Sequence, residues 1–114
     1  MRIAILGGTF NPIHYGHLRL AEEVREALTF DKVLFIPTFI TPHKPEEAMT
    51  PSDARLEMVK IAVKGNSYFE ASDIEIKRGG KSYTIETVRT LIKEGCGDIS
   101  LILGSDSFND ITMW

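Results

Sequence analysis

The chain has 114 residues, of which 43% are hydrophobic and 25% charged, and its formal net charge is −3. This length and balance indicate one ordinary globular domain and exclude a disordered tail, a collagen-like repeat and a membrane-spanning protein. The slight acidic excess offers no broad basic surface for nucleic acid. A lone cysteine, Cys96, excludes internal disulfides and favours a reducing, cytoplasmic setting.

Two short apolar runs, Ile3–Leu6 and Val33–Ile36, are typical of buried strands, and Ile99–Leu103 is expected to form the last strand. Gly7 and Gly8 are expected to end the first of them. Tyr68–Ile76 is predicted to form one or two extended pieces, because apolar and polar residues alternate there.

Apolar residues at helical spacing predict helices between these runs, over residues 18–28, 51–65 and 84–94. Thr50 is the expected N-cap of the second helix. Arg55, near the start of that helix, is expected to be a surface or ion-pair residue.

The order β-α-β-α-β-α-β predicts the α/β class, with an open parallel sheet of about four strands, right-handed crossovers and helices on both faces. Ligands of such sheets lie outside the carboxyl ends of the strands, near the point where the strand order reverses. Glycines and polar residues follow three predicted strands, at Gly7-Gly8-Thr9, Pro42-His43-Lys44 and Gly104-Ser105-Asp106. The sequence therefore predicts a site at this edge.

The segment Gly7–His17 carries the most distinctive chemistry. Two glycines after a buried strand let a ligand approach the backbone and expose amide N–H groups to an anion. The next helix is expected to begin between His14 and His17, which would direct its N-terminal amides at the same anion. Both imidazoles lie on one face of that turn, where they could donate hydrogen bonds to phosphate oxygens, and Gly16 removes a side chain that would clash with a ligand.

The residues of this segment also allow other interpretations. Two glycines can form a simple turn, and the residues alone leave that open. A zinc site needs a third ligand at a suitable spacing, which the sequence does not offer, so no metal site is predicted. The G-x-G-x-x-G and Walker patterns are both missing.

Residues 8–17, GTFNPIHYGH, resemble the signature of the nucleotidyltransferase superfamily, in which histidine-x-glycine-histidine follows a glycine-rich turn. Later stretches resemble the bacterial nicotinate-nucleotide adenylyltransferases: Pro42-His43-Lys44, Ser82–Thr87, Gly104–Phe108 and Trp114. The resemblance covers essentially the whole chain. It implies a Rossmann-like nucleotidyltransferase fold and adenylyl transfer from ATP to nicotinate mononucleotide, which gives nicotinate adenine dinucleotide and pyrophosphate in NAD biosynthesis.

The resemblance also implies roles for individual residues. His14 and His17 would be catalytic residues on the ATP phosphates, and the other ATP-binding residues would be Gly7, Gly8, Thr9, Phe10, Gly16, Gly104 and Asp106. The acceptor would be bound by Lys44, Thr84 and Trp114, although Thr84 is also explained as a helix N-cap and Lys44 as a solvated lysine. Mg²⁺ would arrive with ATP, because the sequence has no dedicated carboxylate cluster.

Compared with this family, residues 1–114 are expected to form a single but incomplete nucleotidyltransferase domain, which lacks the fifth strand and the C-terminal phosphate-binding segment. Two alternatives stay open. One is a sister adenylyltransferase that acts on nicotinamide mononucleotide or phosphopantetheine. The other is an inactive nucleotide-binding fragment that forms homo-oligomers through exposed apolar surface.

Overall fold

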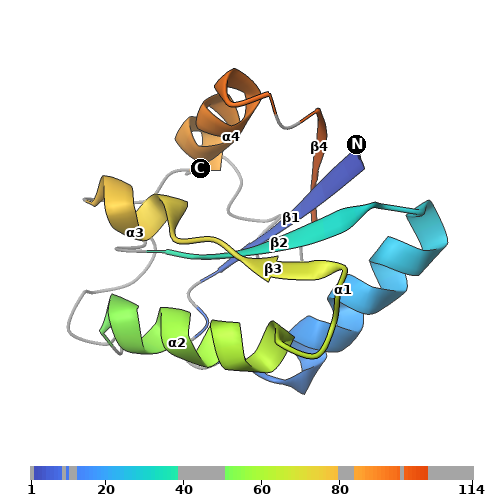
Figure 1. The fold of residues 1–114 in the computed structure, drawn as a ribbon, viewed down its shortest axis with the longest axis horizontal. Coiled ribbons are helices and arrows are strands. Elements are labelled where there is room, and N and C mark those ends of the chain that lie inside the picture. The colour runs from blue at the N-terminus through green and yellow to red at the C-terminus, as the bar shows by residue number, and fades with distance from the viewer. Residues whose placement is uncertain are drawn as a thin grey trace, which may run out of the picture.

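The computed structural model describes residues 2–8, 10, 13–38, 51–79, 84–95 and 97–102. Within them the chain forms β1 (Arg2–Gly8), α1 (Tyr15–Leu28), β2 (Lys32–Pro37), α2 (Ser52–Val63), β3 (Phe69–Ala71), α3 (Ile74–Arg78), α4 (Thr84–Lys93) and β4 (Asp98–Leu101). The strands make one parallel sheet in the order β3-β2-β1-β4 (Figure 1). The predicted α/β class and open sheet of four parallel strands are confirmed.

The two central strands are buried on both faces, as their unbroken apolar runs predict. In β1 the run from Ile3 to Leu6 is at most 5% exposed. It pairs in register with β2, with Ile5 opposite Leu34. Because neither face meets water, both sets of alternating side chains are apolar.

Each face of the sheet is covered by its own pair of helices (Figure 1). On one face α1 and α2 pack against the sheet, in a core that includes Ala4, Leu6, Phe10, Ala21, Val33, Phe35, Val59 and Val63. On the other face α3 and α4 pack against a second core formed by Ile3, Ile5, Leu34, Ile36, Ile74, Val88 and Leu91. The predicted placement of helices on both faces is confirmed.

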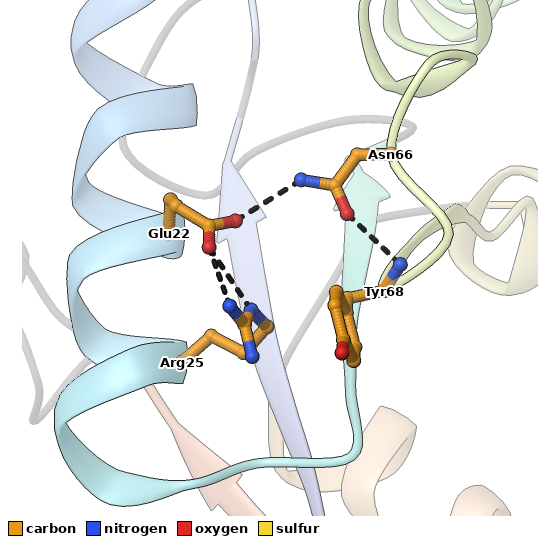
Figure 2. Close-up of polar contacts among 4 residues, drawn as sticks. All are labelled: Glu22, Arg25, Asn66 and Tyr68. Carbon is orange, nitrogen blue, oxygen red and sulfur yellow. Dashed lines mark hydrogen bonds and ion pairs between the residues drawn. The ribbon is translucent and has the colours of Figure 1, made fainter.

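A polar network joins α1 to the turn after α2 (Figure 2). The Asn66 side-chain amide donates to Glu22 (3.0 Å) and its oxygen accepts the Tyr68 N–H (2.9 Å). Glu22 also pairs with Arg25 at 2.6 Å, and the guanidinium of Arg25 lies 3.9 Å from the centroid of the Tyr68 ring. These contacts hold α1 against the turn that follows α2.

One sequence prediction about the backbone is half wrong. Part of Tyr68–Ile76 is extended, as β3, but Ile74–Arg78 forms the short helix α3. Its turn is closed by the Lys77 N–H on the Asp73 carbonyl (2.8 Å). Four alternating residues are too few to separate a strand from one helical turn, and Glu75, which alternation would place outward, is buried.

Gly7 and Gly8 are the last two residues of β1, opposite Ile36 and Pro37 of β2, so they end the strand as expected. One further expectation needs correction. Arg55 is not a surface residue, because it is only 1% exposed within α2, and burial lowers the pKa of its guanidinium. Thr50, the expected N-cap of α2, lies outside the described residues.

No helix in the described part of the chain is both long enough and apolar enough to cross a membrane.

Candidate active site

The strand order reverses beside β1. The chain runs outward from β1 through β2 to β3 and then returns to place β4 on the other side of β1. The carboxyl ends of β1 and β4, at Gly8 and Leu101, therefore flank the switch point at which open α/β sheets bind ligands. The glycines and both histidines of the distinctive segment come at and after the carboxyl end of β1, as the sequence predicts.

Gly7 and Gly8 are extended residues at the end of the central strand, so the alternative of a simple turn is wrong. Gly7 is exposed, and an added Cβ there would lie 3.8 Å from the Ile36 carbonyl oxygen. At Gly8 it would lie 3.6 Å from the Phe10 ring. Both are ordinary contacts, so the described neighbours do not themselves require glycine, and close approach by a ligand remains its best explanation.

Phe10 is a buried residue between β1 and α1. Its φ is 49°, a left-handed conformation that is unusual for a bulky residue and costs about 1–3 kcal/mol. The ring is 3% exposed, lies edge-on to His17 (centroids 5.0 Å apart) and packs against Phe35. Burial of the ring offsets the backbone strain and brings Phe10 against the histidine.

His14 and His17 cap the helix that they begin. His14 is the N-cap of α1, and its Nδ1 accepts the Gly16 N–H at 3.1 Å. In return, the His14 N–H donates to Nδ1 of His17, also at 3.1 Å. The two rings stack with centroids 3.9 Å apart and planes inclined by 29°. This is a capping box built from two imidazoles in place of the usual Ser/Thr and Glu/Gln.

The cap determines which ring nitrogen carries the proton. Because Nδ1 of each ring accepts a backbone N–H, the neutral ring holds its hydrogen on Nε2. Each imidazole thus has an Nε2–H to donate, for which the described part of the chain shows no acceptor. The hydrogen bond that Nδ1 of His17 accepts also disfavours protonation of that ring, since an imidazolium has no acceptor nitrogen.

The helix amides are less available to a ligand than the sequence predicts. The Gly16 N–H is bonded to His14 Nδ1, and the His17 N–H is bonded to the His14 carbonyl oxygen (3.0 Å). The expectation that these two amides face an anion directly is therefore wrong. At these two positions, the hydrogen-bond donors left for a ligand belong to the histidine side chains.

Gly16 leaves space that its neighbour uses. A Cβ at Gly16 would lie 2.9 Å from Cε1 and 3.0 Å from Nδ1 of His14, which is closer than real Cβ atoms approach. The space attributed above to a ligand is thus filled by the capping ring of His14. Glycine here allows the cap to form.

The environment of His17 favours its neutral form. Partial burial lowers the pKa of His17 below its ordinary value of 6.5, and a positive charge on His14 lowers it further. At neutral pH His17 is thus an uncharged donor of a hydrogen bond.

Several predicted site residues lie outside the described part of the chain: Thr9, Lys44, Gly104, Asp106 and Trp114. Thr84 is the first residue of α4. The structure thus brings together Gly7, Gly8, Phe10, Gly16 and the two histidines. No group of three or more His, Cys, Asp or Glu side chains that could hold a metal ion occurs among the described residues.

Thr38 is a residue of this edge to which the sequence analysis gives no role. It directly follows β2, and its N–H donates to the Gly8 carbonyl at 3.0 Å. Its hydroxyl oxygen is buried and makes no hydrogen bond. The one feature of the sequence that could have indicated a site residue here is the position of this hydroxyl, directly after a buried strand.

Comparisons with known proteins agree with the resemblance drawn from the motifs. Two bacterial proteins named "Probable nicotinate-nucleotide adenylyltransferase" are similar to the whole chain: that of Geobacter metallireducens is 54% identical and that of Geobacter sulfurreducens 50%. The chain spans about half of their length, 53% in each case.

A solved structure shares the fold. It is Plasmodium falciparum nicotinic acid mononucleotide adenylyltransferase complexed with NaAD, with a TM-score of 0.79 and 20% identity over 99% of this chain and 56% of that one. The family described as cytidylyltransferase-like matches residues 5–114. Since that match takes in nearly every residue, the chain belongs to the cytidylyltransferase-like family.

Proposed function

We propose that this protein transfers the adenylyl group of ATP to nicotinate mononucleotide and releases pyrophosphate. The observation that carries the proposal is the pair of imidazoles at the switch point, in each of which Nδ1 accepts a backbone N–H and Nε2 is left to donate. The choice of acceptor is supported by similarity of the whole chain to relatives that bear this name.

The reaction requires no covalent intermediate on the protein. A phosphate oxygen of nicotinate mononucleotide forms a bond to the α-phosphorus of ATP as the bond from that phosphorus to the bridging oxygen breaks. Pyrophosphate leaves with the bonding electron pair. Catalysis then consists of aligning the two phosphates and stabilising charge on the equatorial oxygens and the leaving group.

The histidines fit that task as hydrogen-bond donors. The Nε2–H groups of His14 and His17 bind phosphate oxygens whose charge grows in the transition state, and neither group transfers its proton. Removal of one such donor from a preorganised site typically costs about 10²–10³ in kcat. His17, packed against Phe10, is the better fixed of the two.

The remaining contacts follow the resemblance. Gly7, Gly8, Thr9 and Phe10 line the nucleotide site after β1, Gly16 contributes to it by making room for the His14 ring, and Gly104 and Asp106 line it after β4. Lys44, Thr84 and Trp114 bind the acceptor. The seven residues of the nucleotide site and the three residues of the acceptor site are the positions to test by mutagenesis.

The magnesium ion belongs to the substrate in this proposal. ATP enters as its Mg²⁺ complex, and the ion offsets phosphate charge during transfer. The reaction is assigned to the cytoplasm, where a chain with one cysteine stays reduced. Self-association through apolar surface is a separate proposal, which light scattering at several concentrations tests.

The test measures pyrophosphate release by the full product of the gene, with Mg-ATP and each of three acceptors: nicotinate mononucleotide, nicotinamide mononucleotide and phosphopantetheine. Release with the first acceptor, and a fall of at least about 100-fold in His17→Ala, is expected. A preference for another acceptor would assign the protein to a sister enzyme. A normal rate in His17→Ala would remove that residue from the mechanism.

A further inference from the structure

A buried polar cluster lies between α3 and α4, away from the histidines. Thr87 is 1% exposed and Glu75 5% exposed. The Thr87 hydroxyl donates to Oε2 of Glu75 at 2.6 Å and accepts from Nη2 of Arg78 at 3.2 Å. Nε of Arg78 lies 3.5 Å from a carboxylate oxygen of Glu86. We call Glu75, Arg78 and Thr87 the α3–α4 clamp.

The clamp spans a specific piece of backbone. Arg78 is the last residue of α3, and Thr87 lies one turn into α4, so the contacts bracket the point where α4 begins at Thr84. A five-residue helix has no stability of its own. Its direction relative to α4 therefore depends on contacts such as these, together with the packing of Ile74 on the sheet.

Stability alone does not account for the clamp. A buried ionic group can often be replaced by apolar residues of similar volume with no loss of stability. Here a carboxylate, a guanidinium and a hydroxyl are instead joined in a directional chain. Nη1 of Arg78 is buried and makes no hydrogen bond within the described residues, so the charge is only partly satisfied there. Such an arrangement favours one orientation of the two helices over others.

We propose that Glu75, Arg78 and Thr87 are positioning residues for the acceptor site. They hold the first turn of α4, where Thr84 lies, in the orientation that receives the acceptor's negatively charged ring substituent. This inference rests on the proposed function, which assigns Thr84 to the acceptor. It concerns orientation only, since the clamp residues act through α4 and not on the substrate.

The test compares three variants of the full gene product. Thr87→Val removes the hydroxyl, and Thr87→Ser keeps it. Thr90→Val is the matched control, because the Thr90 hydroxyl bonds only to the Glu86 carbonyl of its own helix (2.9 Å) in the contacts observed. We expect Thr87→Val to raise KM for nicotinate mononucleotide about tenfold, with KM for ATP unchanged. Thr87→Ser and Thr90→Val should stay within about twofold of the wild type.

Hydrogen exchange separates the clamp from the proposed function. Thr87→Val should speed amide exchange about tenfold at Val88 and Arg89, whose N–H groups bond to carbonyls of the first turn of α4, whereas Thr90→Val should leave exchange at these two amides unchanged. Wild-type exchange in Thr87→Val would overturn the inference whatever the substrate. Faster exchange with an unchanged acceptor KM, or with an equal rise in KM for ATP, would overturn the positioning role.

If the wild-type protein transfers no adenylyl group to nicotinate mononucleotide, the proposed function fails and the acceptor part of the inference falls with it. The exchange result would then still decide whether these three side chains hold α4.

Discussion

Gly16→Ala separates the histidine cap from the stability of the helix. The added Cβ would lie 2.9 Å from Cε1 of His14, so the ring must leave its capping position while the helical backbone stays in place. His14 then loses the hydrogen bond from the Gly16 N–H, and with it the interaction that fixes Nε2–H as its donor.

Two opposing terms decide the effect on folding. Loss of an N-cap hydrogen bond costs about 1 kcal/mol. Replacement of glycine by alanine inside a helix stabilises by up to about 1 kcal/mol. The free energy of unfolding should therefore change by less than about 1 kcal/mol, with Tm shifted by no more than about 4 °C. Activity should respond differently, because a misplaced donor costs about 100-fold in kcat.

The assay pairs thermal unfolding with pyrophosphate release in the full gene product, and ¹⁵N shifts of the imidazoles report which ring nitrogen is protonated. Gly65→Ala is the control, since a Cβ at Gly65 meets nothing within 4 Å. Normal kcat in Gly16→Ala, with His14 displaced, would refute the role of the cap. A loss of more than about 3 kcal/mol would show that the backbone yields instead of the ring.

Three further predictions concern other parts of the chain. The lowered pKa of His17 means that the unfolded chain takes up its proton first as pH falls through 6.5, so stability from this residue is present above that pH and lost below it. In His17→Gln, whose side chain can still complete a capping box, thermal unfolding between pH 8 and 5 should show a shallower loss; an unchanged slope would contradict the assignment. Asn66→Ala should cost about 1–2 kcal/mol in urea unfolding by removing one hydrogen bond to Glu22 of α1 and one from the Tyr68 N–H within the turn after α2, whereas the exposed Ser67→Ala should cost almost nothing. Phe10→Ala should cost about 3 kcal/mol, and Phe10→Gly about 1 kcal/mol less because glycine accepts the positive φ; an alanine variant more stable than the glycine variant would disprove backbone strain there.

The parts of the fold that follow from local pattern were predictable. Unbroken apolar runs require burial on both faces, and β1 and β2 have it. The start of α1 between His14 and His17 also follows from the sequence. The helix α3 did not, because its conformation is decided by the packing of Ile74 and the buried contacts of Glu75, which are tertiary. The burial of Arg55 has the same cause, since a charged residue early in a helix gives no local sign of it.

The chemistry of the site divides in a similar way. Residue types and spacing placed two imidazoles beside a helix N-terminus, and the structure has them there. The expectation that the Gly16 amide faces an anion was wrong, because residue spacing does not reveal that Nδ1 of each imidazole accepts a backbone N–H. That contact depends on rotamers, on the space at Gly16 and on the ring of Phe10 beneath His17.

The use of imidazoles in place of helix amides should make phosphate binding depend on pH. Backbone amides at a helix end would bind phosphate at any ordinary pH and would tolerate any side chain. Here the Gly16 and His14 amides bind imidazole nitrogens, so the donors left for a ligand are Nε2–H groups of side chains. Protonation of His17 removes the acceptor that the His14 N–H needs, and so weakens the helix start and the geometry of the donor together. Acid should therefore impair phosphate binding by misplacing the imidazoles, even though it adds positive charge that would otherwise attract an anion.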